Sequence, residues 1–166
     1  VCGDTLMRKV LDDAQRGMRI LMEHSKVDRN RIGLLGHSYG GNTSLFQASL
    51  DERIRFVCVS GAVCSYKAKL AKGIGLEMAL VIPGFAQHYD IDDLISCIAP
   101  RRLLIVSATE DVYSCDANII VEIGRKAYER FDKSNYLEHR RYEGRHKLDK
   151  KRFYEIVEWI EDQCQS

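Results

Sequence analysis

The chain has few prolines, no low-complexity tract and no long apolar run, and each absence excludes a class of protein. Two prolines in 166 residues, without a biased stretch, argue against a disordered chain or an array of linkers. The longest apolar stretch, around residues 78–85, is too short to span a bilayer. We therefore expect neither a membrane protein nor a fibrous or disordered one.

Charge of a single sign is also lacking. The 25 Lys and Arg residues nearly balance the 24 Asp and Glu residues, which leaves a net charge of +1. No overall field attracts nucleic acid or an anionic membrane, so neither is expected as a partner. The 45% hydrophobic and 30% charged residues that are present indicate an ordinary globular chain, and its length suits one domain.

The cysteines lack the spacing of a metal or redox motif. They are Cys2, Cys58, Cys64, Cys97, Cys115 and Cys164. No pair has C-x-x-C spacing, which excludes zinc-ribbon and thioredoxin-like sites, and we expect no metal ligands. Reduced thiols are the expectation, although the even number leaves some pairing open.

The start of the chain is unusual. It begins at Val1 rather than Met and opens on helical sequence with no strand before it. We therefore expect a segment of a longer protein. Localisation stays open for the same reason, with the cytoplasm as the default.

Apolar patterns predict helices and strands in alternation. Strands are expected at residues 31–35, 55–60, 102–107 and 136–142. Helices are expected at residues 4–24, 40–50, 91–98, 118–131 and from Asp149 onward. This order predicts the α/β class, with a mostly parallel sheet covered by helices on both faces and the polar 136–142 strand at its edge.

The apolar stripes of the last two helices are predicted from their spacing. For residues 118–131 the stripe is Ile119, Ile120, Ile123, Ala127 and Phe131, and for the last helix it is Phe153, Ile156, Val157 and Ile160. The irregular residues 62–100, between the second and third strands, are long for a connection. We interpret them as an insertion or lid-like segment of a single domain, 1–166.

A G-x-S-x-G motif at residues 36–40 directly follows the first strand and opens a helix. In this context Ser38 is expected in a strained turn that exposes its hydroxyl. Gly36 and Gly40 are expected to be small because strand and helix approach too closely for a Cβ. The N–H of Tyr39, at the helix N-terminus, is positioned to hold an oxyanion.

A serine nucleophile needs a base and a carboxylate that orients the base. In this class of fold such groups come from loops at the carboxyl ends of strands. The third predicted strand leads to Asp111, with Glu110 as the competing carboxylate, and the fourth leads to His146. The other histidines are His24, His37, His88 and His139. The chain order Ser, acid, His favours Asp111 and His146.

Three stretches together resemble the α/β-hydrolase family, in its dienelactone hydrolase and acetyl xylan esterase-like branch. They are VDRNRIGLLGHSYGG, PGF…YDIDDLISCIAPRRLLIVSATED and YEGRHKL. The resemblance covers nearly the whole chain but only the C-terminal two-thirds of the usual domain. It implies an α/β-hydrolase fold without the N-terminal strands, and it implies Ser38 as nucleophile, His146 as general base and acid, and Asp111 as orienting carboxylate.

The chain departs from the family in two places. The loop that normally supplies the second oxyanion N–H has no counterpart, and residues 112–115 read Val-Tyr-Ser-Cys where relatives tend to have a proline. The resemblance implies a serine esterase acting on short acyl or acetyl esters, with carbohydrate esters among them, through an acyl-enzyme and without a cofactor. His37, Phe85 and His88 are expected to bind this small-molecule substrate, and a homo-oligomer stays open.

Two alternatives remain at this point. S-Y-G-G elbows also occur in prolyl-oligopeptidase-type serine peptidases, and a non-catalytic hydrolase-like module could keep its pocket for a ligand. The retained Ser, Asp and His argue against the binding module. A basic run near the C-terminus is interpreted as a solvated face. It comprises Arg140, Arg141, Arg145, Lys147, Lys150, Lys151 and Arg152.

Overall fold

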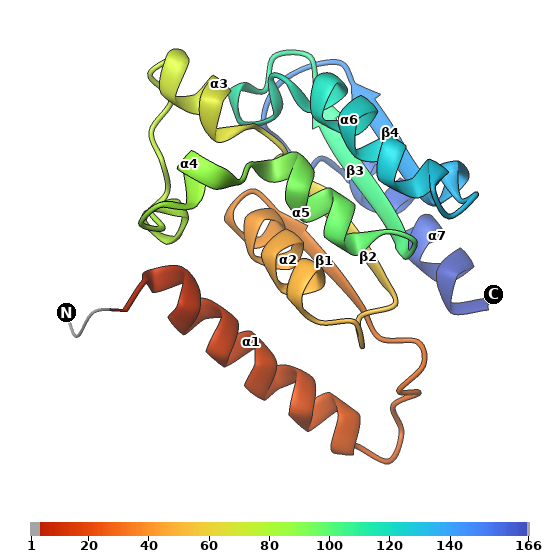
Figure 1. Ribbon diagram of the computed structural model, residues 1–166. Coiled ribbons are helices and arrows are strands. Elements are labelled where there is room, and N and C mark those ends of the chain that lie inside the picture. Colours follow the sequence, from red (N-terminus) through yellow and green to blue (C-terminus); the bar gives the residue numbers. More distant parts are fainter. Residues whose placement is uncertain (1–3, 166) are drawn as a thin grey trace.

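A computed structural model describes residues 4–165 and shows a twisted sheet with helices packed on it (Figure 1). Within those residues the strands are β1 Gly33–His37, β2 Phe56–Ser60, β3 Arg102–Ala108 and β4 Leu137–Tyr142. The helices are α1 Leu6–Glu23, α2 Tyr39–Leu50, α3 Tyr66–Ala71, α4 Phe85–His88, α5 Ile91–Ile98, α6 Ala117–Glu129 and α7 Lys150–Gln165. Short 3₁₀ turns lie at Met78–Leu80, Val112–Ser114 and Ser134–Tyr136.

The sheet has the order β1-β2-β3-β4, and every pairing is parallel. The α/β class and the edge position of β4 are therefore confirmed. The first strand begins two residues later than predicted and continues through the motif glycine, because its pairing with β2 extends to His37 opposite Ser60. Since the strands are parallel, all their carboxyl ends meet at one edge of the sheet.

Along each strand, alternate side chains point into two separate cores, one on each face of the sheet. Val57 and Val59 of β2 point into the larger core with α1, α2, α5 and α6. Phe56 and Cys58 point into the smaller core, which α7 covers. Figure 1 shows α2, α5 and α6 across the near face of the sheet and α7 behind it. Helices on both faces were predicted, and this arrangement confirms them.

The phase of α6 differs from the predicted stripe. Ile119, Ile123 and Phe131 are all exposed, with Ile119 at 64%. The buried residues are Ala117, Ile120, Val121, Gly124 and Tyr128. Packing against α5 decides this phase, because a Cβ on Gly124 would lie 2.5 Å from Cγ2 of Ile95. The helix turns Gly124 toward α5. Ile119 and Ile123 therefore face solvent, as does Phe131 just beyond the end of the helix.

The buried face of α7 follows the predicted stripe in part. Ile156 is buried as predicted, but Phe153 is 44% exposed, and Arg152 and Trp159 are buried in addition. The Trp159 ring meets Phe56 edge-on at 6.0 Å, and its Nε1 donates to a carboxylate oxygen of β4 at 2.6 Å. Hydropathy alone could not find this face, because its first buried residue is an arginine.

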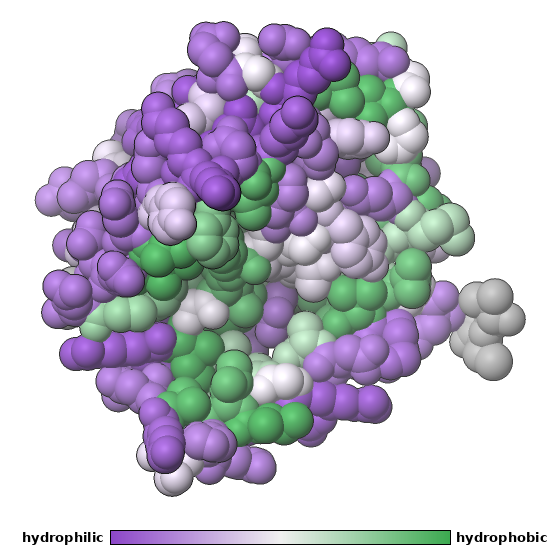
Figure 2. All heavy atoms as spheres, turned by 180° about the vertical axis from the view of Figure 1, so that it is seen from behind, coloured by the Kyte–Doolittle hydropathy of each residue, from purple (hydrophilic) through white to green (hydrophobic). Residues whose placement is uncertain are grey.

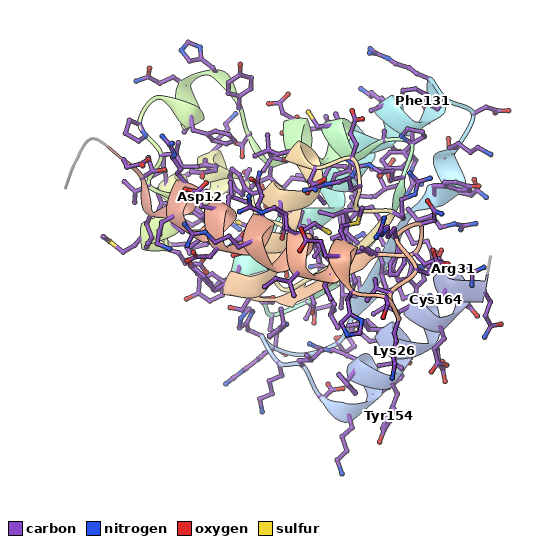
Figure 3. The ribbon with its side chains drawn as sticks, turned by 90° about the horizontal axis from the view of Figure 1, so that it is seen from below. Asp12, Lys26, Arg31, Phe131, Tyr154 and Cys164 are labelled. Atoms are coloured by element: carbon purple, nitrogen blue, oxygen red, sulfur yellow. The ribbon has the colours of Figure 1, made fainter. Side chains whose placement is uncertain are left out.

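Across residues 4–165, no helix covers the far side of β1. Leu34 packs toward the larger core, so Leu35 faces the other way and is 41% exposed. Seen from behind, hydrophobic residues are exposed among hydrophilic ones, mainly left of the centre and in the lower part of the view (Figure 2). Figure 3 shows Arg31 beside Cys164, whose carbonyl accepts from the guanidinium at 2.6 Å and joins the approach to β1 to the end of α7. Within residues 4–165 no helix has both the length and the apolar character needed to cross a membrane.

Arg101 connects three segments at the opposite edge of the sheet from the strand carboxyl ends. Its guanidinium donates to five backbone carbonyls, at 2.7 to 3.2 Å. The acceptors are Ala48, Asp51, Ile54, Cys97 and Ile98. Helix C-terminal carbonyls have no partner inside their own helix. One side chain therefore satisfies the ends of α2 and α5 and the turn before β2.

We predict that Arg101→Met lowers the free energy of unfolding by about 3 kcal/mol, because it leaves several half-buried carbonyls without donors. Urea denaturation followed by the fluorescence of Trp159 measures this loss. Arg130→Met, at an exposed position, is the matched control and should change stability by less than about 0.5 kcal/mol. If Arg101→Met lost as little stability as the control, the role of Arg101 in joining these segments would be contradicted.

Candidate active site

The four loops at the carboxyl edge of the sheet carry the chemistry-bearing residues. Ser38 follows β1, Gly61 follows β2, Asp111 lies beyond β3 and His146 lies beyond β4. Because the strands are parallel and in register, these four loops converge although Ser38 and His146 are 108 residues apart. The site is thus a direct product of the sheet topology.

Ser38 sits in a tight turn between β1 and α2. Its φ of 56° and ψ of −122° lie outside the regions that side chains favour, and its N–H donates to the Ser60 carbonyl at 2.8 Å. The turn brings the two backbones so close that a Cβ on Gly36 would lie 2.0 Å from the Gly40 carbonyl oxygen. The prediction that Gly40 also needs to be small was wrong, since a Cβ there meets nothing within 4 Å.

A continuous hydrogen-bond chain joins the serine, the histidine and the aspartate. His146 Nε2 lies 2.8 Å from Ser38 Oγ, and its Nδ1 lies 3.0 Å from Asp111 Oδ1. A carboxylate accepts from Nδ1–H, and this tautomer leaves Nε2 free to accept from the serine hydroxyl. The arrangement can therefore take the hydroxyl proton as the oxygen attacks.

The Asp111 side chain is buried, with 2% of it exposed, and is held by the turn that follows it. The Tyr113 N–H donates to Oδ1 at 2.9 Å, and the Ser114 hydroxyl donates to Oδ2 at 2.9 Å. The competing Glu110 points elsewhere, toward Nε of Arg145 at 3.3 Å. The Val-Tyr-Ser-Cys departure thus supplies the two donors that hold the carboxylate.

Arg152 holds the histidine loop, and sequence reasoning missed it. Its guanidinium donates to the carbonyls of Glu143, Arg145 and Lys147 at 2.8, 3.0 and 2.6 Å, on both sides of His146. Only 5% of the residue is exposed, so this member of the basic run does not belong to a solvated face. Its i, i+4, i+7 spacing with two buried apolar residues of α7 was the available signal.

Two rings and a glycine surround the His146 imidazole. His37 stacks on it at 4.8 Å, and Tyr113 meets it edge-on at 4.9 Å. Gly61, at φ +60°, leaves room for both imidazoles, because a Cβ there would lie 2.9 Å from His146 Cε1. His37 Nδ1 lies 3.0 Å from Ser60 Oγ. Burial lowers the pKa of His37, and the neighbouring His146 lowers this pKa further.

His37 therefore lies directly against the imidazole of the hydrogen-bond chain, and its expected substrate contact stays a prediction. Phe85 and His88 lie elsewhere. Phe85 packs on Phe46 at 5.5 Å and lines a cavity of about 390 Å³ between α1 and α2. His88 lines a separate cavity with Tyr89. Among residues 4–165, neither ring stacks on or hydrogen-bonds to the Ser38–His146–Asp111 chain, and their substrate roles also stay predictions.

The first turns of α2, next to Ser38, contact the 62–100 segment. The N–H of Tyr39 belongs to the first turn of α2, where backbone donors have no acceptor inside the helix. One turn later, Asn42 Nδ2 donates to Glu77 Oε2 at 2.6 Å. This hydrogen bond fastens the 62–100 segment beside the serine.

Solved esterase structures share this architecture. A glucuronoyl esterase from Solibacter usitatus matches 92% of this chain and 47% of its own, with a TM-score of 0.76 and 18% identity. The chain has the α/β-hydrolase fold. A promiscuous CE15 esterase from a marine bacterial metagenome gives the same TM-score of 0.76 at 17% identity, over 92% of this chain and 47% of that one.

Sequence comparisons find similarity between this chain and carbohydrate esterases. Residues 3–73 match the family model of acetyl xylan esterase (AXE1). The protein YtaP of Bacillus subtilis (strain 168), named as a hydrolase, is 30% identical over 114 residues, 66% of this chain and 37% of its own length. Carbohydrate esterase MZ0003, from an unknown prokaryotic organism, is 29% identical over 53% of this chain and 24% of its own. The chain thus spans well under two thirds of these relatives.

We predict that the protein loses stability as the pH falls from 6.5, the ordinary pKa of histidine. Burial lowers the pKa of His37 and of His139, whose Nε2 lies 2.8 Å from Ser107 Oγ. The unfolded chain therefore binds protons at these residues before the folded one does. This stability is complete above the unfolded pKa and is lost as pH falls toward the folded values.

Urea unfolding between about pH 7 and about pH 5 measures this effect. The combined His37→Gln and His139→Gln variant should show a shallower decline than the unaltered protein. His24→Gln, at an exposed position after α1, should show the same decline as the unaltered protein. A decline that is identical in all three proteins would refute the assignment.

Proposed function

We propose that this α/β-hydrolase cleaves carboxylic esters of carbohydrates, with Ser38 as nucleophile, His146 as general base and acid, and Asp111 as the orienting carboxylate. The observation that carries the proposal is the hydrogen-bond chain of 2.8 Å and 3.0 Å through these side chains. The similarity to acetyl xylan esterase over residues 3–73 supports the ester class.

The proposed reaction has two halves. Ser38 Oγ attacks the ester carbonyl while His146 Nε2 takes its proton, and the Tyr39 N–H stabilises the developing oxyanion. His146 returns the proton to the leaving alcohol. The alcohol departs, and the acyl group stays bound to Ser38 as the acyl-enzyme. Water then attacks the acyl group while His146 takes its proton, and His146 returns that proton to Ser38 Oγ as the carboxylic acid leaves. Asp111 stabilises the imidazolium that forms in both halves.

Sugars that carry short acyl groups in ester linkage are the proposed substrates. The family model matched here is that of acetyl xylan esterase, and one relative is named as a carbohydrate esterase. We propose that the 62–100 segment, fastened by the Asn42–Glu77 hydrogen bond, forms the side of the site that contacts the sugar. No cofactor takes part in the proposed steps.

We predict that a fluorophosphonate probe forms one covalent adduct, on Ser38, because this hydroxyl has a base within hydrogen-bond distance. Intact-mass measurement should show the adduct in the unaltered protein and none in Ser38→Ala. His146→Ala should slow labelling at least about 100-fold. Ser49→Ala, at the far end of α2, is the matched control and should label like the unaltered protein.

Turnover of acetylated xylo-oligosaccharides, chromogenic acetyl esters and a prolyl-peptide amide then separates the alternatives. Cleavage of the acetyl esters alone supports the proposal. Preferential cleavage of the amide would indicate a prolyl-oligopeptidase-type peptidase. Saturable ester binding without an adduct or turnover would indicate a binding module.

We further predict that Gly61→Ala lowers kcat at least about 10-fold with little change in KM, because the new Cβ displaces the His146 ring from Ser38. Gly73→Ala is a close control. Gly73 has nearly the same φ, +64° against +60°, but a Cβ there meets nothing within 4 Å. The two substitutions carry similar backbone strain, so equal activity in both variants would rule out the steric role of Gly61.

A further inference from the structure

Two cysteines and a carboxylate meet behind the aspartate turn. Cys64 lies in the loop after β2, and Cys115 and Asp116 lie between the 112–114 turn and α6. The two Sγ atoms are 3.7 Å apart although 51 residues separate them in sequence. One ligand atom of each of the three residues lies within 4.8 Å of the others. The catalytic proposal uses none of them.

We propose that Cys64, Cys115 and Asp116 bind a thiophilic divalent cation such as zinc. Two sulfurs bound to one tetrahedral zinc at about 2.3 Å lie about 3.8 Å apart. The observed 3.7 Å between the two Sγ atoms matches that chelate, whereas a disulfide requires about 2.05 Å. Sequence spacing excluded a C-x-x-C site but could not exclude a pair brought together by the fold.

The third ligand is already oriented. The Ser65 N–H donates to Asp116 Oδ1 at 3.2 Å, and the Ser65 hydroxyl donates to Oδ2 at 2.5 Å. Ligating carboxylates typically accept such outer hydrogen bonds, which fix their direction and leave other lone pairs for the ion. Binding draws the carboxylate inward, since up to 4.8 Å now separates the ligand atoms. Water can take the fourth position.

Burial and charge suit a site that is filled from one side. Cys64 is fully buried, whereas Cys115 and Asp116 are half-buried and provide the entry path. Burial raises the pKa of the Cys64 thiol well above its usual value, and Asp116 and Cys115 raise it further. A bound dication reverses this preference, because it stabilises both thiolates. The two thiol protons leave to solvent, and the filled site has a net charge of −1.

The site adjoins the aspartate turn. Cys115 directly follows Ser114, whose hydroxyl donates to Asp111 at 2.9 Å. Cys64 lies three residues beyond Gly61, the residue that backs the His146 ring. A cation would therefore join the loop after β2 to the loop after β3 at the rear of the site. The proposal does not depend on ester cleavage.

Cadmium, which absorbs in the ultraviolet when bound to thiolate, is a direct probe of the site. Titration of the reduced whole protein should give a thiolate–cadmium band that saturates at one ion per chain, and zinc should abolish it by competition. Cys115→Ser should lose the band, and Asp116→Asn should weaken binding at least about 10-fold. Cys97→Ser, at an exposed thiol on α5, is the control and should bind like the unaltered protein.

Cys115 and Asp116 are the primary test positions because they are only half-buried, so their variants should fold. Thermal unfolding with and without zinc gives a second readout. The melting temperature should rise with zinc in the unaltered protein and in Cys97→Ser, and should not rise in Cys115→Ser. A band that persists in Cys115→Ser, or no band at all in reduced protein, would overturn the proposal. So would a Cys64–Cys115 disulfide whose reduction yields no metal uptake.

Discussion

The close approach of α2 to the end of β1 is the constraint on which the site depends. With the Gly40 carbonyl only 2.0 Å from where a Gly36 Cβ would lie, the chain must reverse within one residue. That residue is Ser38, and its positive φ follows from the reversal. The strain is maintained because the Ser60 carbonyl holds the Ser38 N–H at 2.8 Å and the strand beneath is paired along its length. The serine hydroxyl therefore points outward as a consequence of backbone packing.

The other two members of the hydrogen-bond chain are fixed by different means. Asp111 is held locally, since its donors come from the next three residues. His146 lies in a loop with little regular structure, and Arg152 holds that loop by three carbonyls from the start of α7. The geometry of His146 thus depends on how α7 docks on the rear of the sheet. A change at the buried face of α7 would reach the site through Arg152 rather than through the sheet.

Sequence reasoning found the parts of this protein whose signals are local. The G-x-S-x-G motif after an apolar strand predicted the elbow, and parallel topology placed Asp111 and His146 at the correct strand ends. The predicted stripes of α6 and α7 were only partly right, because tertiary packing, through Gly124 and Arg152, decides which residues are buried. The meeting of Cys64 with Cys115 could not be found either, since it depends on the register of two loops.

The hydrogen bonds that Arg101 donates have a consequence for the 62–100 segment. That segment leaves the sheet beside the site at Gly61 and ends before Arg101, whose guanidinium joins the end of α5 to the end of α2 and to the turn before β2. Its inner part packs into the larger core, and its outer part reaches α2 through the side chain of Glu77. Insertions and substitutions in its outer part can accumulate without disturbing strand register. Under the proposed function, such changes would alter the surroundings of the substrate while the sheet stays the same.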